Sequence, residues 1–271
     1  MKELFKRSIT GILYVFLLLS AAILNTEAFN FLFLVFGLAC LYEFKKLIKL
    51  SGYYIFLAFL GLWWLFLYLI EDYTQKKELA LILLVTTLAA NIFLIGELFQ
   101  NRRLKYSNMA RFAISLFYIG NGFIFLTMIP YYEYHFAKFL IIGIFILIWV
   151  NDSFAFLIGK TFGKRKLFPS VSPKKTIEGF AGGFLFALIA SLILAEYGDD
   201  LSRWQWLLLT TVVVVTGTLG DLVESKFKRL AGVKDSGAIL PGHGGLLDRL
   251  DSLIFAAPFA YLTLQVFSYV S

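Results

Sequence analysis

The residues best suited to chemistry lie between Gly220 and Ser252. Helical spacing there places Asp221, Ser225 and Lys228 on one face, at positions i, i+4 and i+7. A carboxylate, a hydroxyl and an ammonium group in one stripe can hold a phosphate together with its metal ion. A simple ion pair within the helix is the alternative, but it does not require a serine between the two charged residues. The spacing therefore favours phosphate chemistry.

A glycine-rich segment follows and leads into two further carboxylates. Glycines at this density allow backbone N–H groups to approach an anion closely. Asp248 and Asp251 come next, one helical turn apart. With Asp221 they supply up to three carboxylates, enough for Mg²⁺ held by one or two carboxylates and by substrate phosphates. His243, within the glycine-rich segment, is either a donor to phosphate or an ordinary loop residue.

A second polar region precedes these residues in the chain. Asp152 interrupts an apolar run, where an acid is costly and is either functional or paired with a lysine. Ser172 and Pro173 have the order of an N-cap and a first-turn proline, so we expect a helix to begin there. Its free N–H groups would form a phosphate cradle together with Lys174, Lys175 and the hydroxyls of Ser172 and Thr176. A basic cap that binds lipid head groups explains the same residues.

Membrane helices must position these residues, because the composition excludes a soluble domain. Of the 271 residues, 59% are hydrophobic and only 16% are charged, and the mean hydropathy is +0.78. Soluble proteins carry about 25% charged residues. The long apolar runs also exclude intrinsic disorder. The single cysteine, Cys40, allows neither an intramolecular disulfide nor a cysteine-based zinc site.

We expect an all-α polytopic integral membrane protein with about nine transmembrane helices, since a span needs about 20 apolar residues. The expected spans lie near Ser8–Leu24, Ala28–Tyr42, Tyr53–Ile70, Leu79–Phe99, Phe112–Pro130, Phe139–Ile158, Ile177–Ala195, Trp204–Leu222 and Leu250–Val270. A cleaved signal peptide is the alternative for the first run, because basic residues precede an apolar stretch that contains small residues.

The distribution of Lys and Arg predicts the orientation. Alternate connections, counted from the N-terminus, contain all of the 25 Lys and Arg residues except Lys76, Lys77, Lys138 and Arg203. Short loops rich in these residues remain cytoplasmic. We therefore expect a cytoplasmic N-terminus, an outer C-terminus and every polar motif at the cytoplasmic face. Residues 1–130 are expected to form a scaffold of membrane helices, and residues 131–271 a catalytic membrane region.

At these motifs the chain resembles the phosphatidate cytidylyltransferases, also called CDP-diacylglycerol synthases. The C-terminal signature of that family is matched, in order, by Ser225, Lys228-Arg229, Lys234-Asp235, His243-Gly244-Gly245 and Asp248-Arg249-Leu250-Asp251. A second family segment, Ser-Pro-x-Lys-Thr-x-Glu-Gly, is matched by residues 172–179, and Asp152 and Gly159-Lys160 precede it. The N-terminal half is similar only as hydrophobic spans.

The resemblance implies that CTP and phosphatidic acid react to give CDP-diacylglycerol and pyrophosphate, a step of phospholipid biosynthesis. It also implies a divalent ion, a polytopic fold in the cell membrane and a homodimer. The lipid phosphate would attack the α-phosphorus of CTP, and because a phosphate monoester has its second pKa near about 6, no strong general base is needed.

Site roles follow from that reaction. We expect Asp221 and Asp248 to hold Mg²⁺, with Asp152 and Asp251 as further ligands and a second metal ion of unknown identity as an option. Lys228 and His243 complete the expected catalytic residues. The expected substrate-binding residues are Ser172, Lys175, Thr176, Ser225, Arg229, Lys234 and Arg249.

Other functions fit the sequence less well. A transporter would place polar groups through the membrane, whereas the outer halves of the last four expected spans are almost wholly apolar. A CTP-dependent lipid kinase acting on a polyprenol or similar alcohol would need a general base and would release CDP. A purely structural protein gives no reason for ordered polar motifs. The net charge of +7 follows the membrane topology, so no nucleic-acid partner is expected.

Overall fold

The structure is a computed structural model that describes residues 2–69, 73–100, 106–132, 135–240, 242 and 244–270. Its elements are α1 (Lys2–Leu24), α2 (Thr26–Leu47), α3 (Tyr54–Trp64), η1 (Leu65–Leu69), α4 (Tyr73–Leu98), α5 (Asn108–Ile114), η2 (Ser115–Gly120), α6 (Asn121–Met128), α7 (Lys138–Thr161), β1 (Lys166–Phe168), β2 (Ser172–Thr176), α8 (Ile177–Tyr197), α9 (Arg203–Ala231) and α10 (Leu247–Val270). Across these ranges one two-stranded sheet accompanies the helices. The expected helical membrane architecture is confirmed.

Seven helical segments in the described part of the chain are long and apolar enough to cross a membrane. They are Thr26–Leu47, Glu78–Leu98, Asn108–Met128, Lys138–Thr161, Ile177–Tyr197, Arg203–Ala231 and Leu247–Tyr269. Two shorter apolar helices, Thr10–Leu24 and Tyr54–Leu67, coincide with the two remaining expected runs. Every expected run is therefore largely helical, because a helix satisfies its backbone polar groups internally where water is absent.

Helix α9 continues past its apolar part, so that the polar residues Asp221, Ser225 and Lys228 are helical too. It begins with a capping box, in which Ser202 and Gln205 each bind the backbone of the other. It ends at Ala231, and the capping residue Gly232 has a φ of 73°, the left-handed conformation that glycine favours at helix ends. The helix has 29 residues, so Asp221 and Lys228 lie on one continuous helix, as the spacing predicted.

The expected helix start at Ser172 is wrong. Ser172–Thr176 forms β2, which pairs antiparallel with β1. The cap of α8 is instead Thr176, whose hydroxyl accepts a backbone N–H at 3.1 Å. Glu178, in the first turn of α8, accepts the backbone N–H groups of Lys164 at 3.0 Å and Arg165 at 3.1 Å. These hydrogen bonds favour the hairpin over an earlier helix start, and the free helical N–H groups at Ser172 are therefore absent.

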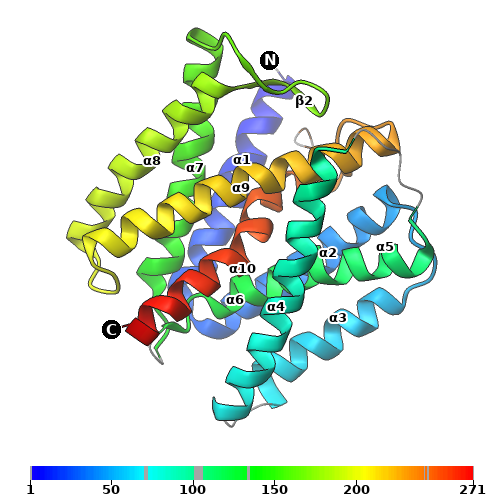
Figure 1. Cartoon of the computed structure of the whole chain (residues 1–271), viewed down its shortest axis with the longest axis vertical. Helices are drawn as coiled ribbons and strands as arrows, with labels where there is room; N and C mark the ends of the chain where they lie inside the picture. The colour runs from blue at the N-terminus through cyan, green and yellow to red at the C-terminus, as the bar shows by residue number, and fades with distance from the viewer. Residues whose placement is uncertain are drawn as a thin grey trace.

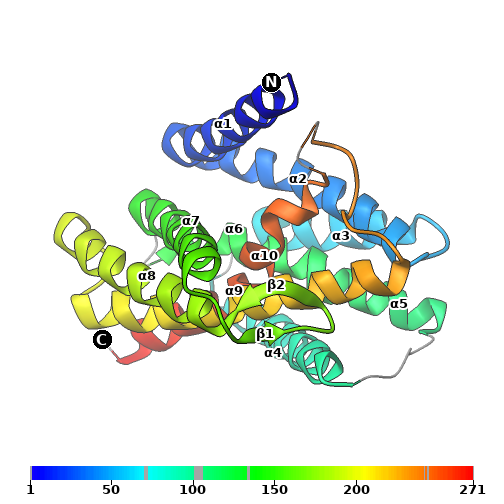
Figure 2. The ribbon, with the colours of Figure 1, turned by 90° about the horizontal axis from the view of Figure 1, so that it is seen from above.

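The site-bearing helices pack in pairs, α7 along α8 and α9 along α10 (Figure 1). The hairpin β1–β2 lies at the same end of the molecule as the N-terminus (Figure 1). Seen from that end, the loop between α9 and α10 runs beside α2 (Figure 2). Segments from both halves of the chain therefore meet near the polar motifs.

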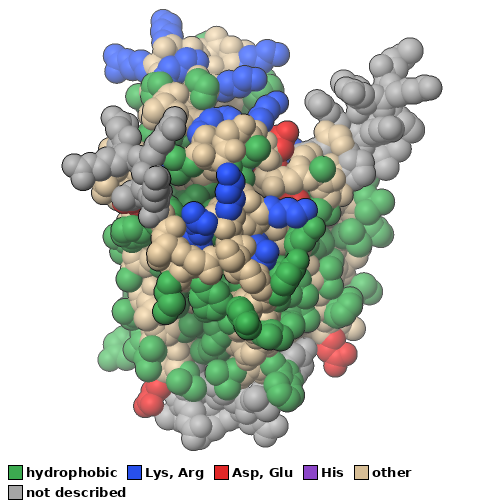
Figure 3. Space-filling view, turned by 90° about the vertical axis from the view of Figure 1, so that its right-hand side faces the viewer, with side chains coloured by type: hydrophobic (Ala, Val, Ile, Leu, Met, Phe, Trp, Pro, Cys, Tyr) green, Lys and Arg blue, Asp and Glu red, His purple; other side chains and the backbone are tan. Residues whose placement is uncertain are grey.

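Charged and apolar side chains separate along the long axis of the molecule. Lys and Arg gather at the end that carries the hairpin, whereas hydrophobic side chains cover the middle of the same face (Figure 3). Two of the four basic residues that are expected on the outer side, Lys138 and Arg203, contact residues near the ends of α1 and α8. Lys138 donates to the carbonyl oxygen of Ile23 at 2.8 Å, and Arg203 pairs with Glu196 at 2.6 Å.

Candidate active site

A cavity of about 430 Å³ lies between α7, the hairpin, α8 and α9. Its polar lining includes Asp152, Lys160, Lys166, Lys174, Lys175, Thr176 and Asp221. Apolar side chains, among them Phe156 and Phe180, complete the wall. A cavity with several cations, two carboxylates and an apolar side can accommodate a ligand that is both polyanionic and lipidic.

Asp221 connects the two polar regions that the sequence singled out. Its Oδ2 atom forms an ion pair with Nζ of Lys175 from β2, and its Oδ1 atom accepts a hydrogen bond from Oγ of Ser225 at 3.2 Å. Both charged side chains remain about 30% exposed, at 30% for Lys175 and 29% for Asp221. The carboxylate is therefore accessible to a ligand in the cavity.

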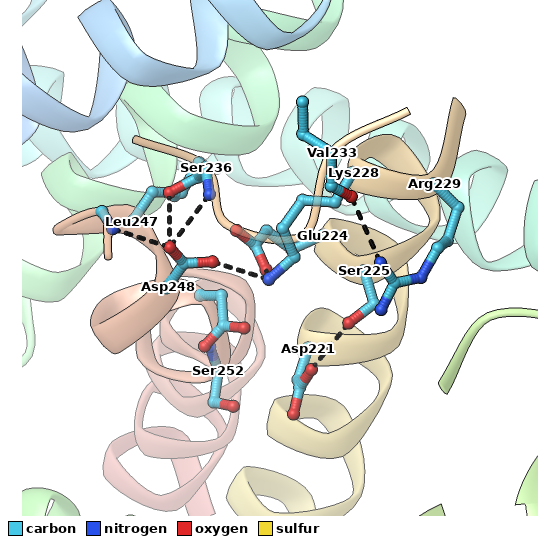
Figure 4. Close-up of polar contacts among 12 residues, drawn as sticks. Asp221, Glu224, Ser225, Lys228, Arg229, Val233, Ser236, Leu247, Asp248 and Ser252 are labelled. Atoms are coloured by element: carbon cyan, nitrogen blue, oxygen red, sulfur yellow. Dashed lines mark hydrogen bonds and ion pairs between the residues drawn. The ribbon is translucent and has the colours of Figure 1, made fainter. Parts of the chain in front are cut away.

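Lys228 shares the face of Asp221 but binds other carboxylates. Its Nζ atom pairs with Glu224 of the same helix and with Oδ1 of Asp248 from α10, at 2.7 Å (Figure 4). The lysine side chain is 10% exposed and that of Glu224 is fully buried. Sequence reasoning missed Glu224, although its i, i+4 spacing to Lys228 was visible. A buried cation between two carboxylates is held firmly in place.

Asp248 fixes the loop that joins α9 to α10. Its Oδ2 atom accepts three hydrogen bonds, from the backbone N–H of Ser236 at 2.9 Å, the hydroxyl of Ser236 at 3.0 Å and the backbone N–H of Gly245 at 2.8 Å. Its other oxygen binds Lys228. Both oxygens of Asp248 are thus engaged by the protein in this arrangement.

Glu43 and Ser236 were also missed by sequence reasoning. Glu43 of α2 accepts the backbone N–H of Leu247 at 2.9 Å and the hydroxyl of Ser236 at 3.3 Å. The signal for Glu43 was weak, because this acid directly follows the expected run Ala28–Tyr42 and precedes Lys45 and Lys46. Ser236 gave no signal, because a serine in a polar loop is common.

The two remaining expected carboxylates come from other helices than Asp221, Asp152 from α7 and Asp251 from α10. Asp152 lines the cavity and accepts a hydrogen bond from the side-chain amide of Asn151 at 3.3 Å. Asp251 is buried, 7% exposed, and accepts the backbone N–H of Ser252 at 2.6 Å. Both carboxyl groups interact electrostatically with Asp221, so the three groups belong to one cluster.

The other expected site residues are only partly brought together. Arg229 binds backbone oxygens, donating to Val171 at 3.3 Å and to Val233 at 3.2 Å. Ser172 lies on β2, Lys234 is exposed in the loop and Arg249 is exposed in the first turn of α10. His243 lies outside the described residues. Among these, Arg229 connects the hairpin turn to the end of α9.

The donor set fits a divalent cation at the cavity. Asp152 and Asp221 both line it, and Mg²⁺ is commonly held by one or two carboxylates together with substrate phosphates and water. Within the described residues, no three Asp, Glu, His or Cys side chains form a metal-binding group by themselves. Phosphate oxygens would therefore have to complete the coordination.

Comparisons with known proteins agree with the geometry. The model of the cytidylyltransferase family matches residues 5–267. A phosphatidate cytidylyltransferase of Bacillus subtilis (strain 168) is 36% identical over 285 residues, which cover 99% of this chain and 100% of that protein. Proteins of the same name from Staphylococcus aureus (strain COL) and Staphylococcus saprophyticus are 43% and 41% identical over 168 residues, covering 62% of this chain and 63% of each relative.

Proposed function

The chain belongs to the cytidylyltransferase family, and from that premise we propose that it transfers the cytidylyl group of CTP to phosphatidic acid, yielding CDP-diacylglycerol and pyrophosphate. It is a nucleotidyltransferase with several membrane-spanning helices. The observation that carries the substrate proposal is the cavity in which Lys175 and Asp221, from separate motifs, meet beside apolar side chains. Such a cavity suits a lipid phosphate and a nucleotide together.

In the proposed reaction an oxygen of the lipid phosphate forms a bond to the α-phosphorus of CTP, and the bond to pyrophosphate breaks. The nucleophile is already ionised near neutral pH, so the protein does not need a strong base. Its main task is to bring two polyanions together and align them. The four lysines that line the cavity, Lys160, Lys166, Lys174 and Lys175, offset the repulsion between the phosphates.

Asp221, together with Asp152, would hold Mg²⁺ in this proposal, and the ion would stabilise negative charge on the phosphates when bound. Asp248 and Asp251 remain further candidates, and a second metal ion stays an option. Lys228, Arg229, Lys234, Arg249 and His243, with the hydroxyls of Ser172, Thr176 and Ser225, are proposed phosphate-binding groups.

We further propose nine spans in the cell membrane, with the N-terminus and the active site on the cytoplasmic side and a homodimer as the assembly. The gathering of Lys and Arg at the hairpin end supports this orientation (Figure 3). Residues 131–271 would carry the catalytic groups, and residues 1–130 would support them. A site at the boundary between the membrane and the cytoplasm would receive a diacyl substrate from the bilayer and CTP from the cytoplasm.

Pyrophosphate release by the purified protein in detergent tests the proposed function. The assay contains CTP, Mg²⁺ and phosphatidic acid, and each component is omitted in turn. We expect release only when all three are present, together with a CDP-lipid product. Release of CDP with a polyprenol acceptor would instead identify a lipid kinase, and the absence of turnover in a folded sample that binds CTP would reject both enzymes.

A further inference from the structure

Glu43 comes from the N-terminal half of the chain, yet it contacts the loop between α9 and α10. It lies near the end of α2 and is 2% exposed. Its Oε2 atom accepts the backbone N–H of Leu247 at 2.9 Å and the hydroxyl of Ser236 at 3.3 Å. Both partners are about 200 residues away in sequence, at separations of 204 and 193. The carboxylate therefore joins α2 to both ends of the loop.

The loop is shaped to fit this carboxylate. A Cβ atom on Gly237 would clash with Oε1 of Glu43. One on Gly245 would clash first with Oγ of Ser236 and would also lie 2.6 Å from Oε2 of Glu43. Real Cβ atoms do not approach an oxygen so closely, and the Glu43 and Ser236 side chains are both buried with little room to move. A side chain at Gly237 would therefore push the loop away from α2, and one at Gly245 would displace Ser236 as well as Glu43. The absence of side chains at these two glycines is therefore what allows the loop to lie against the Glu43 carboxylate.

The same loop also binds Asp248, one of the expected metal ligands. Ser236 and Gly245 donate hydrogen bonds to Asp248, which in turn holds Lys228. Glu43 of α2 and Asp248 of α10 thus both bind the loop, and the hydroxyl of Ser236 lies between their carboxylates. Glu43 does not line the cavity of Asp152 and Asp221. Any effect of Glu43 on the reaction must therefore pass through the loop and α10.

Packing alone does not account for an acid at this position. A carboxylate is costly to bury, and an apolar side chain would fill the space between helices without that cost. The donors that face Oε2 are Leu247 N–H, at the first residue of α10, and the single hydroxyl hydrogen of Ser236, which Glu43 shares with Asp248. The benefit of Glu43 lies in fixing these two groups.

We propose that Glu43 is a positioning residue for the reaction, which fixes the α9–α10 loop and the first turn of α10 so that Asp248 and Lys228 keep their alignment. This inference rests on the proposed function for its catalytic part. The loop-anchoring part does not depend on which substrates the protein uses.

The kinetic test compares Glu43→Ala and Glu43→Gln with Glu27→Gln, a matched control at an exposed acid in the first turn of the same helix. We expect Glu43→Ala to lower kcat by about 10- to 100-fold, as for other supporting residues, with little change in KM for phosphatidic acid. Glu43→Gln should recover most of the rate, because its amide oxygen can accept both hydrogen bonds. An unchanged kcat in Glu43→Ala would overturn the proposal.

A second measurement reports on the loop without any turnover. A nitroxide is attached to Ala238→Cys, an exposed loop position, in a Cys40→Ala background that removes the single native cysteine. Electron paramagnetic resonance should show a more mobile label in Glu43→Ala and in the milder Ser236→Ala, and no change in Glu27→Gln. Unchanged mobility in both variants would overturn the anchoring.

The two measurements distinguish a failure of the proposed function from a failure of the positioning role of Glu43. If the parent protein turns over no CTP with phosphatidic acid, the proposed function fails, while label mobility still decides whether Glu43 anchors the loop. If the parent is active and Glu43→Ala changes neither kcat nor mobility, the positioning role fails and the proposed function stands. Ser236→Ala and Glu43→Gln keep the test available if Glu43→Ala does not fold.

Discussion

Asp221 is the residue on which the proposed chemistry depends most. It pairs with Lys175, accepts a hydrogen bond from Ser225 and faces the cavity. Asp221→Asn keeps the shape of the side chain but removes the negative charge that would attract Mg²⁺ and orient Lys175. We expect turnover to fall by about a hundredfold or more, a loss typical of removing an electrostatic group from an active site.

The measurement is the rate of pyrophosphate release across a range of Mg²⁺ concentrations, with the unfolding temperature in detergent as a check of folding. Asp199→Asn, at an exposed acid in the connection between α8 and α9, serves as the matched control and should change neither value. A normal rate in Asp221→Asn at limiting Mg²⁺ would contradict the metal role.

Lys228 matters for stability, because its ammonium group is buried between two carboxylates. Removing it leaves Glu224 fully buried and Asp248 nearly so without a compensating cation. We expect Lys228→Met to lower the free energy of unfolding by about 3–5 kcal/mol, the usual cost of breaking a buried ion pair. The additional change Glu224→Gln should recover part of that loss. Denaturation in detergent measures both variants, and a Lys228→Met protein as stable as the parent would contradict the structural role.

At the scale of the element, the β1–β2 hairpin brings Lys166, Lys174 and Lys175 over the cavity. Its position is fixed by Glu178, which accepts the backbone N–H groups of Lys164 and Arg165. The carboxylate therefore supports the hairpin although it does not line the cavity.

Glu178→Gln should weaken this support, because a neutral amide accepts hydrogen bonds less strongly than a carboxylate does. We expect a higher KM for CTP or phosphatidic acid and a smaller change in kcat. Steady-state kinetics for both substrates measure the two parameters, and Glu196→Gln near the other end of α8 is the control. Equal KM values in the two variants would show that the hairpin does not depend on Glu178.

For the molecule as a whole, the proposed orientation places the hairpin and the α8–α9 connection on opposite sides of the membrane. Single cysteines at Lys164 and Asp199, both exposed, distinguish the sides in the Cys40→Ala background. In intact cells, a membrane-impermeant maleimide should label Asp199→Cys. It should label Lys164→Cys only after the membrane is permeabilised. The reverse pattern would invert the topology.

Much of the helical architecture could be predicted because it depends on local properties of the chain. Apolar runs become helices wherever backbone groups must be satisfied without water, and a continuous helix fixes the neighbours of each residue. The contact between Asp221 and Ser225 follows directly from that spacing. The order and spacing of the polar motifs also indicated the family, which the full-length comparison bears out.

Tertiary structure decided which partners the charged groups take. The stripe on α9 divides between two environments, since Asp221 pairs with Lys175 of the hairpin and Lys228 with Asp248 of α10. The expected helix at Ser172 gave way to a strand, because its β-partner and the Glu178 contacts are absent from the local sequence. Helical periodicity sets spacing within one element, whereas these pairings depend on how separate elements pack. Glu43, which reaches the loop from the other half of the chain, is visible only once that packing is known.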